Sequence, residues 1–431
     1  MIIFYNRDIL SNFGSGNGYG GNMENIFISD ITIECVRHLK HITIPLSDGE
    51  RKHLILTGKN GSGKTSVLEA LSDYLNLRIT SKEVANILRS LSSLLQDPKA
   101  RRDEKNWVEY HEEELEKTGA TKTGVKLRFN CQEELLRDYF KEGEFVLAYY
   151  KAERAFYAEQ PGHIEKVELK DIYTMEETPR QEFIKYLADL KVTEALARSN
   201  RKQEKAEAIA EWFAKFQDLL QKIFDDSSLE LIFEEDTFSF SIKEKDREVF
   251  DFNTLASGFA AALDIILDVM MRMQKSKGRI FDFNMPGIVL IDEIETHLHL
   301  ELQKKILDLL TTIFPNIQFI MSTHSPFILN SLSNAVIYDL EKRMLVQDGL
   351  ANIPYSGIVE GYFKSSELSY SLKEKYERYK ILTQKHDLLD DDFEEIAQLE
   401  MYLNEIPDYL ALGITTEYQR IKMEFENRED L

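Results

Sequence analysis

Residues 53–71 read HLILTGKNGSGKTSVLEAL, and they constrain the fold of this chain more than any other stretch. An apolar strand runs into a loop of small residues and then into a helix. The loop is Gly58-Lys59-Asn60-Gly61-Ser62-Gly63-Lys64-Thr65-Ser66. Its glycines allow successive backbone N–H groups to surround phosphate oxygens, and the following helix directs its positive dipole end at the same anion. Lys64 then reaches the β- and γ-phosphates and Thr65 holds Mg²⁺, so the stretch predicts a nucleotide-binding P-loop.

The composition indicates a soluble globular protein. Its 431 residues are 43% hydrophobic, enough for two or three domains with a sizeable core. The net charge of −22 argues against a broad positive face, so nucleic acid is only weakly supported as a partner. Cys35 and Cys131 are too few for a disulfide framework or a zinc site, and they suit a reducing compartment. Without an apolar run of roughly 18 residues or a signal sequence, we expect a cytoplasmic protein that does not contact a membrane.

Two further apolar runs predict a parallel sheet. GIVLIDE (287–293) and NIQFIMSTH (316–324) are continuous apolar stretches, as expected of strands that are covered on both faces. Between them HLELQKKILDLLTTIF (299–314) has the pattern of a helix. A strand, a helix and a second strand in this order form a crossover unit, so the sequence predicts an α/β fold.

Antiparallel strands and helices are expected around this sheet. IFISDITIECV (26–36) and HITIPL (41–46) alternate as the two strands of a hairpin, with a turn at Arg37-His38-Leu39-Lys40. EFVLAYYKAERAF (144–156) predicts a buried strand that ends in Arg154. The remaining expectations are a strand at 125–129, an amphipathic helix at 204–224, a hairpin at 229–245, and helices at 80–145, 253–275 and 360–431.

Carboxylates and a histidine follow the two buried strands. Ile288-Val289-Leu290-Ile291-Asp292-Glu293 has the form of a Walker B strand, in which Asp292 binds Mg²⁺ and Glu293 activates a water in line with the γ-phosphate. His324, within Ser322-Thr323-His324-Ser325-Pro326, lies at the end of the next strand and fits a switch residue that contacts the γ-phosphate. These residues are expected at one sheet edge, beside the P-loop.

His297 and His299 lie between these motifs, in Glu295-Thr296-His297-Leu298-His299. Their spacing in a turn is poor for a shared metal, and no Cys or third ligand accompanies them. We favour a turn that crosses a subunit interface near the nucleotide.

Leu255-Ala256-Ser257-Gly258-Phe259 lies at the start of a predicted helix. By itself it indicates only a serine at a helix N-terminus. After a P-loop and before a Walker B strand, it resembles the signature motif of ABC-type ATPases. That resemblance implies that Ser257 and Gly258 bind the γ-phosphate held by a partner subunit. LASGF departs from the usual LSGGQ-like form, and Gln132 is only a weak candidate for the Q-loop glutamine.

The order of P-loop, signature, Walker B and His loop resembles ABC-type ATPases of the SMC, RecF and OLD kind. GIVLIDEIETHLHLELQKKIL and FPNIQFIMSTHSPFILNS are similar to the small defence-associated members, namely the ATPase of the Septu anti-phage system and those encoded with retrons. The sequence also resembles the ATPase of the PARIS system. The resemblance covers residues 24–80 and 250–340 well and implies an ABC-type head with antiparallel β and helical insertions.

The resemblance also implies how the protein works. Two heads sandwich two Mg-ATP molecules, each between one P-loop and the other subunit's Ser257, so we expect a dimer of heads or a higher assembly with slow or regulatory turnover. Members of this kind control an effector, here an HNH-type nuclease from a neighbouring gene. Two alternatives stay open: an OLD-type nuclease-ATPase, and a DNA-repair or SMC-like DNA-binding ATPase.

An OLD-type nuclease would need a Toprim domain with acidic residues. Asp390-Asp391-Asp392 could be mistaken for them, but they lie at a helix boundary, where carboxylates serve as an N-terminal cap. The segment around them, 360–431, holds 18 acidic and 9 basic residues. It either packs on the head or a neighbouring protomer, or docks an effector.

These observations divide the chain into five predicted segments. Residues 1–22 form a flexible N-terminal arm, and 23–80 the N-lobe of the ATPase head with the P-loop. Residues 81–250 form a helical and β insertion and lid. The C-lobe, 251–358, carries the signature, Walker B and switch histidine, and 359–431 form an acidic helical C-terminal segment.

Overall fold

The computed structural model describes residues 25–81, 123–154, 156–245, 247–274, 283–351, 353, 358, 370–404, 412–426 and 428. The predicted N-terminal arm and much of the helical stretch predicted at 80–145 lie outside these residues. The chain divides into two compact units, which we call the head (Met1–Asn352) and the C-terminal unit (Ile353–Leu431).

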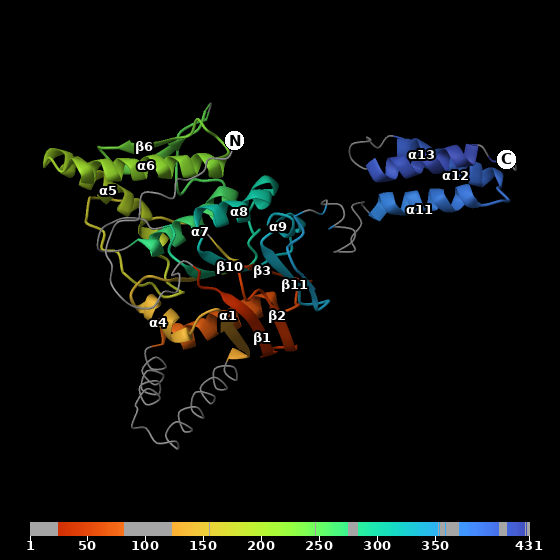
Figure 1. The fold of residues 1–431 in the computed structure, drawn as a ribbon. Helices are drawn as coiled ribbons and strands as arrows, with labels where there is room; N and C mark the ends of the chain where they lie inside the picture. Colours follow the sequence, from red (N-terminus) through yellow and green to blue (C-terminus); the bar gives the residue numbers. More distant parts are fainter. Residues whose placement is uncertain are drawn as a thin grey trace, which may run out of the picture. The chain divides into compact units, whose positions relative to one another are not determined.

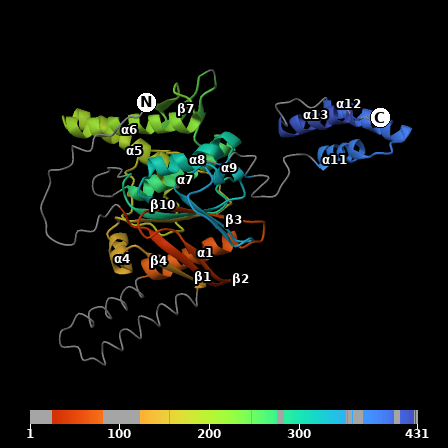
Figure 2. The same cartoon turned by 45° about the vertical axis from the view of Figure 1, so that its right-hand side comes forward.

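Six strands form the central sheet of the head, in the order β12-β11-β3-β10-β9-β5. Five run parallel, and β12 pairs antiparallel with β11 at one edge. In Figures 1 and 2, helix α1 lies on one face of this sheet, and α7 and α8 lie on the other. The four inner strands are buried throughout because helices cover both faces. The strands are β3 (His53–Thr57), β5 (Val146–Tyr150), β9 (Gly287–Ile291), β10 (Ile317–Ser322), β11 (Ala335–Asp339) and β12 (Met344–Val346).

The predicted crossover unit is present. Strand β9 leads through α8 (Leu300–Ile313) to β10, and the two strands pair in parallel, with Met321 opposite Ile291. Strand β3 pairs with the other side of β10, with Ser322 opposite Leu56. The carboxyl ends of all three strands therefore meet at one edge, as the sequence predicts.

A second sheet packs with α1 (Lys64–Leu75). It consists of β1 (Ile28–Val36), β2 (Leu39–Pro45) and β4 (Val125–Phe129), all antiparallel. One apolar cluster includes side chains of this sheet, of α1 and of the central sheet, so α1 belongs to a core that joins both sheets. The hairpin predicted around Arg37 is confirmed. The predicted α/β class, with a mostly parallel sheet, antiparallel strands and helices, is confirmed as well.

Between strands β5 and β9 of the central sheet, the chain forms helices and a third, antiparallel sheet in the order β6-β7-β8. The apolar side of α6, predicted as an amphipathic helix, packs its aromatic residues onto this sheet and α5; the Phe213 and Phe240 rings stack with centroids 6.0 Å apart. The elements between β5 and β9 are η2 (Pro179–Glu182), α5 (Phe183–Ser199), α6 (Gln203–Phe224), β6 (Glu230–Glu234), β7 (Ser239–Lys243), β8 (Phe250–Asp251) and α7 (Ser257–Met273). Helix α4 (Glu133–Lys141) precedes β5 and lies beside α1 in Figures 1 and 2.

The strand predicted at 144–156 is shorter than expected. Strand β5 ends at Tyr150, and Arg154 lies beyond it in an irregular segment. The last paired residues are Tyr150 and Ile291, after which the Asp292 N–H donates to the Tyr150 carbonyl (2.8 Å). The neighbouring strand β9 ends at Ile291, so β5 has no further strand with which to pair.

The described residues of the C-terminal unit form three helices, α11 (Tyr370–Gln384), α12 (Asp390–Asn404) and α13 (Leu412–Glu426). They share an apolar cluster of their own, in which Tyr379 and Tyr418 contact each other (5.2 Å between centroids). The three aspartates at 390–392 lie in the first turn of α12, where the sequence predicted a cap. Across the parts of the chain that the structure describes, no helix has both the length and the apolar character to span a bilayer.

One buried histidine joins the P-loop strand to its neighbour β10. His53 begins β3, and its Nδ1 accepts a hydrogen bond from the Phe319 N–H of β10 (3.1 Å). Burial, with a smaller effect of the Arg51 charge, lowers the pKa of His53 from 6.5 to about 3. The imidazole is therefore neutral, with the lone pair that Phe319 requires.

This histidine predicts a pH dependence of stability. Because the folded-state pKa lies below 6.5, the stabilisation is complete above pH 6.5 and is lost as pH falls toward about 3. Between pH 6.5 and about pH 5, the free energy of unfolding should fall by about 2 kcal/mol through His53 alone. His53→Asn, whose amide oxygen can accept the same hydrogen bond, should remove this component. Denaturant unfolding followed by tryptophan fluorescence measures both proteins; equal pH slopes would contradict the assignment.

Candidate nucleotide-binding site

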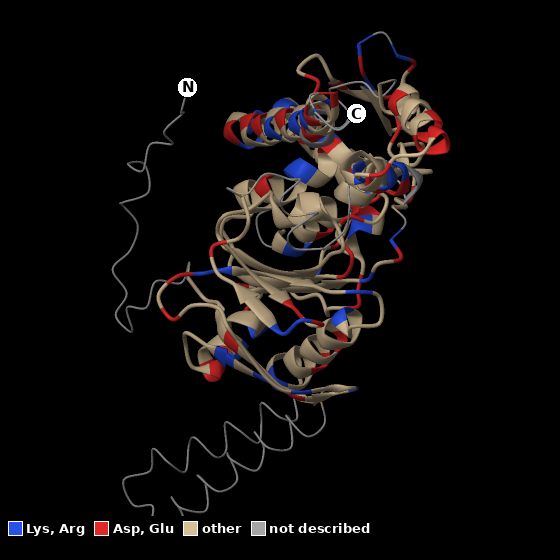
Figure 3. Cartoon of the chain, turned by 90° about the vertical axis from the view of Figure 1, so that its right-hand side faces the viewer, with Lys and Arg blue, Asp and Glu red and all other residues tan. Residues whose placement is uncertain are grey.

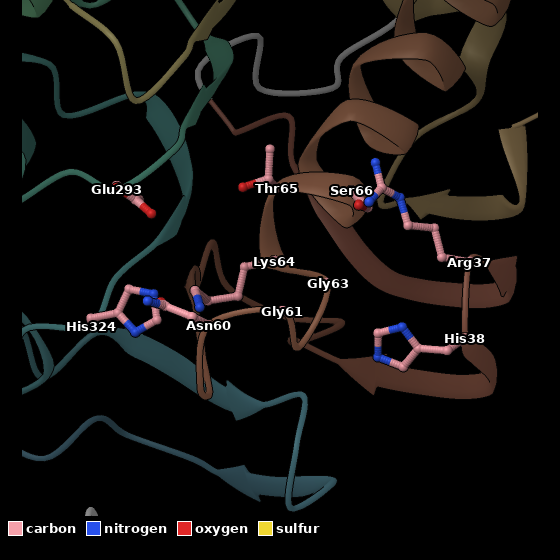
Figure 4. Close-up of a pocket in the computed structure, with 10 residues that line it drawn as sticks. All are labelled: Arg37, His38, Asn60, Gly61, Gly63, Lys64, Thr65, Ser66, Glu293 and His324. Atoms are coloured by element: carbon pink, nitrogen blue, oxygen red, sulfur yellow. The ribbon is translucent and has the colours of Figure 1, made fainter.

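A cavity of about 340 Å³ lies where the sequence predicts nucleotide binding. Four segments line it: the β1–β2 turn, the P-loop, and the residues that follow β9 and β10. Figure 4 shows Glu293 and His324 on one side, Arg37 and His38 on the other, and the P-loop between them. The lining residues are Arg37, His38, Asn60, Gly61, Gly63, Lys64, Thr65, Ser66, Glu293 and His324.

The P-loop has the backbone that its glycines predict. Gly58, Gly61 and Gly63 have φ values of 132°, 80° and 99°, which residues with side chains rarely adopt. Gly63 also faces the hairpin: a Cβ there would lie 2.8 Å from Leu39 Cδ1. These positive φ values bend the loop between β3 and α1, so that its residues 60, 61 and 63 face the cavity.

Lys64 is the first residue of α1, and its ammonium lies over the loop. Its Nζ donates to the carbonyls of Gly58 (2.9 Å) and Lys59 (3.3 Å). Burial lowers the pKa of Lys64, and the nearby carboxylates, Glu293 first among them, oppose that change. A phosphate would offer this ammonium a full negative charge in place of neutral carbonyls.

Three of the predicted P-loop residues do not line the cavity. Gly58 and Ser62 lie in the turn, and the side chain of Lys59 leaves the loop to pair with Glu341 (2.7 Å). Lys59 therefore contributes its backbone to the loop, and its charge is neutralised outside the cavity.

Ser322 joins the ends of β9 and β10. Its hydroxyl donates to Asp292 Oδ1 and accepts the Glu293 N–H (2.8 Å). Asp292 is buried and is not among the lining residues, whereas Glu293 lines the cavity. The Glu293 backbone has a φ of 45°, a left-handed conformation that costs a non-glycine residue roughly 1 kcal/mol or more.

Glu295 holds the loop that carries His324. Its carboxylate accepts hydrogen bonds from the His324 N–H (2.5 Å) and the Thr323 hydroxyl (2.8 Å). Burial and then the Lys64 charge lower the pKa of His324, so the ring is neutral at pH 7. The sequence placed Glu295 in a turn but did not indicate this contact, because it depends on the spatial approach of two loops.

Mg²⁺ prefers oxygen ligands, and the site offers the Thr65 hydroxyl and the Asp292 carboxylate. Within the described ranges, no three His, Cys, Asp or Glu side chains gather as a metal cluster, and His297 and His299 form none. This donor set fits an ion that is held mainly by water and phosphate oxygens, as Mg²⁺ usually is with nucleotides.

Ser257 and Gly258 begin α7, as predicted, but neither lines the cavity of its own chain. Ser257 is exposed, and Gly258 packs against the 297–299 turn. A Cβ at Gly258 would lie 2.8 Å from His299 Cδ2 and 3.1 Å from the His297 carbonyl. The N-terminus of α7 therefore contacts the turn that follows the Walker B residues within one chain.

Arg37 and His38 are lining residues that sequence reasoning missed. The sequence located them in the hairpin turn, where Arg37 has a φ of 52°, but the packing of that turn on the P-loop is a tertiary contact. Gln132 lies just before α4 and is not among the lining residues.

Comparison with known families agrees with this site. Residues 54–330, more than half of the chain, match the family described as "AAA domain, putative AbiEii toxin, Type IV TA system". The match begins in the P-loop strand and extends past the His324 loop. The chain belongs to this AAA-domain family. The prediction of a P-loop ATPase is confirmed.

Curated relatives of this AAA-domain chain include a Septu protein and a retron ATPase. The Septu protein PtuA of Bacillus mycoides (strain KBAB4) is 31% identical over 174 residues, 38% of this chain and 24% of the relative. The Retron Vc95 probable ATPase of Vibrio cholerae serotype O1 biovar El Tor is 45% identical over 69 residues, 15% and 13% of the two chains. The matched regions span about a quarter or less of these relatives. The predicted resemblance to Septu and retron ATPases is confirmed.

Solved structures similar to this AAA-domain chain include SMC heads. The SmcHead bound to the C-winged helix domain of ScpA is 17% identical, with a TM-score of 0.35 over 73% of this chain and 93% of that one. The SMC head domain from Thermotoga maritima gives a TM-score of 0.33 at 14% identity, over 72% and 94%.

The contact between α7 and the 297–299 turn is testable in this AAA-domain ATPase. Gly258→Ala places a methyl group against His299 and should lower the free energy of unfolding by about 1–3 kcal/mol, the usual cost of overpacking. Adding His299→Ala removes the shortest contact and should recover part of the loss. Gly49→Ala, with no atom within 4 Å of its Cβ, is the matched control. Denaturant unfolding measures the wild type and the three variants. A Gly258→Ala variant as stable as the control would contradict the packing.

Proposed function

We propose that this ATPase binds Mg-ATP in the 340 Å³ cavity and hydrolyses it slowly, as a switch. The observation that carries the proposal is the convergence on one cavity of an ammonium, a carboxylate and an imidazole: Lys64, Glu293 and His324. They come from three segments far apart in the sequence, and each follows a buried parallel strand. Phosphoryl transfer depends on positioning and charge stabilisation of this kind.

Each residue has a proposed role. The P-loop amides and Lys64 bind the β- and γ-phosphates, while Glu293 accepts a proton from the attacking water. His324, neutral at pH 7, contacts the γ-phosphate and links its presence to the loop that Glu295 holds. Thr65 and Asp292 would hold Mg²⁺, which neutralises phosphate charge when bound. Arg37 and His38, on the opposite side, are positioned to contact the rest of the nucleotide.

We further propose that a second head completes each site. Ser257 and Gly258 begin a helix whose N-terminus favours an anion, and Ser257 is exposed outside its own cavity. In a dimer of heads, Ser257 of one chain would face the γ-phosphate on the other. Binding that favours the paired arrangement shifts the population of pairs by its difference in affinity.

The names of the relatives suggest the setting. Because matched relatives include a Septu protein and retron ATPases, we propose that the assembly serves anti-phage defence in the cytoplasm and controls an HNH-type nuclease from a neighbouring gene. The predicted acidic C-terminal segment, 359–431, is then either a packing segment or the docking site for that effector.

The alternatives have less support. In Figure 3, Lys and Arg are scattered among Asp and Glu, and the net charge is −22, which disfavours an SMC-like DNA-binding role. An OLD-type nuclease would need a Toprim domain with acidic residues. The described part of the C-terminal unit is helical, and the aspartates at 390–392 lie in the first turn of a helix, which disfavours this alternative.

Hydrolysis by Glu293 is tested with Glu293→Gln. Losing the general base should lower kcat by about 10²–10⁴-fold while the affinity for ATP stays within about threefold. Glu341→Gln is the matched control, since Glu341 lies beside the P-loop but pairs with Lys59 outside the cavity. Phosphate release and equilibrium binding of ATP measure the two effects. Wild-type turnover in Glu293→Gln would exclude Glu293 as the base.

Pairing of heads is tested by mass photometry with and without Mg-ATP. Glu293→Gln should shift to the mass of a pair, or of a larger assembly, when ATP is added, because the γ-phosphate persists. Lys64→Ala should not shift. Ser257→Arg should bind ATP but fail to pair, whereas Ser227→Arg, another exposed serine, should pair normally. A mass distribution that does not change on adding ATP, and that is the same in the Lys64 and Ser257 variants, would refute the nucleotide-dependent assembly.

A further inference from the structure

Arg154 lies at the same sheet edge as the Walker B residues. Strand β5 pairs in parallel with β9, and both end at this edge. The end of β5 is anchored, because the Tyr150 hydroxyl donates to Asp268 of α7 (2.7 Å). Four residues after Tyr150, the side chain of Arg154 turns back across the end of β9.

The Arg154 guanidinium binds the backbone of the turn that follows β9, residues 292–299, which we call the Walker B turn. Nη1 donates to the carbonyl of Asp292 (2.7 Å), and Nη2 donates to those of Glu293 (2.9 Å) and Ile294 (3.4 Å). Nη1 also donates to the carbonyl of Lys151, in its own segment (3.0 Å). One rigid, planar group thus holds three consecutive carbonyls, two of which belong to the proposed metal ligand and the proposed base.

The residue held in this way has an unfavourable backbone. Glu293, at a φ of 45°, persists in the left-handed region only because surrounding groups fix it. On one side the Ser322 hydroxyl accepts its N–H, and on the other Arg154 donates to its carbonyl. The direction of the Glu293 carboxylate into the cavity depends on this conformation.

Arg154 itself does not reach the cavity. Its side chain is buried, with 7% of the residue exposed, and it is not among the lining residues. Burial lowers its pKa, and the charges of Asp264 and Glu295 oppose that effect, so the guanidinium stays charged. A group that contacts the backbone of the base, but not the nucleotide, acts through the base.

We infer that Arg154 is a positioning residue for ATP hydrolysis, which fixes the strained Walker B turn so that Glu293 faces the attacking water. The inference rests on the proposed role of Glu293. It also gives a function to the segment that follows β5, where the sequence had suggested only a continuing strand. The planar fork is essential, because a lysine ammonium cannot reach three carbonyls in a row.

Arg154→Lys tests the inference. The variant should lower kcat by about tenfold to a hundredfold, while KM and the dissociation constant of a non-hydrolysable ATP analogue stay within about threefold. Arg51→Lys is the matched control, since Arg51 also donates to two consecutive carbonyls, Pro315 and Asn316, but at the opposite end of the parallel strands. Equal kcat in Arg154→Lys and the control would overturn the inference, as would a loss of nucleotide affinity as large as the loss of kcat.

A double-variant cycle with Glu293→Gln separates positioning from a general loss of structure. If Arg154 acts through Glu293, Arg154→Lys should cause little further loss in the Glu293→Gln background. Losses that multiply would contradict the inference. Should Arg154→Lys lower the thermal midpoint by more than about 5 °C, Arg154→Gln, which retains a donor, enters the same cycle.

The cycle also distinguishes the two proposals. If Glu293→Gln alone leaves hydrolysis unchanged, the proposed base is wrong and the inference falls with it. If Glu293→Gln abolishes hydrolysis but Arg154→Lys does not alter kcat, only the role of Arg154 is refuted.

Discussion

The parallel pairing of β10 with β3 and β9 is the constraint on which the whole site depends. It places the end of the P-loop strand, the end of the Walker B strand and the loop that carries His324 at one edge of the sheet. Ser322, the last residue of the middle strand, uses its hydroxyl to join Asp292 and the Glu293 backbone. A change of register would move that hydroxyl to the other face, because side chains alternate along a strand.

Around this edge, a few polar contacts connect loops that the sequence keeps apart. Glu295 ties the Walker B turn to the His324 loop, and Arg154 ties the same turn to β5. Gly258 brings the signature helix against His299. The Walker B turn is therefore in contact with three other parts of the head, and a change in any one of them can reach Glu293 through few intermediates. That arrangement is consistent with the proposed nucleotide-dependent switch.

Local patterns predicted much of this. Short stretches of sequence, whose conformation follows from backbone sterics and burial, were enough to predict three features. These are the P-loop with its glycines, the buried strands before Asp292 and His324, and the start of α7 at Ser257. Contacts between distant segments were not predictable in this way. Arg37 and His38 reach the cavity because the hairpin packs on Gly63, and β5 ends at Tyr150 because its neighbour β9 ends. Both features depend on tertiary packing between distant segments, which local sequence patterns do not reveal.

The measurement that tests the account most directly is a structure of the Glu293→Gln variant with Mg-ATP. We predict the triphosphate in the cavity between the P-loop and His324, with Lys64 Nζ moved from the Gly58 carbonyl to a phosphate oxygen. The Arg154 contacts to residues 292–294 should remain, and Ser257 of a second chain should face the γ-phosphate. ATP bound elsewhere, with Lys64 still on the Gly58 carbonyl, would contradict the central claim that this sheet edge is the nucleotide site.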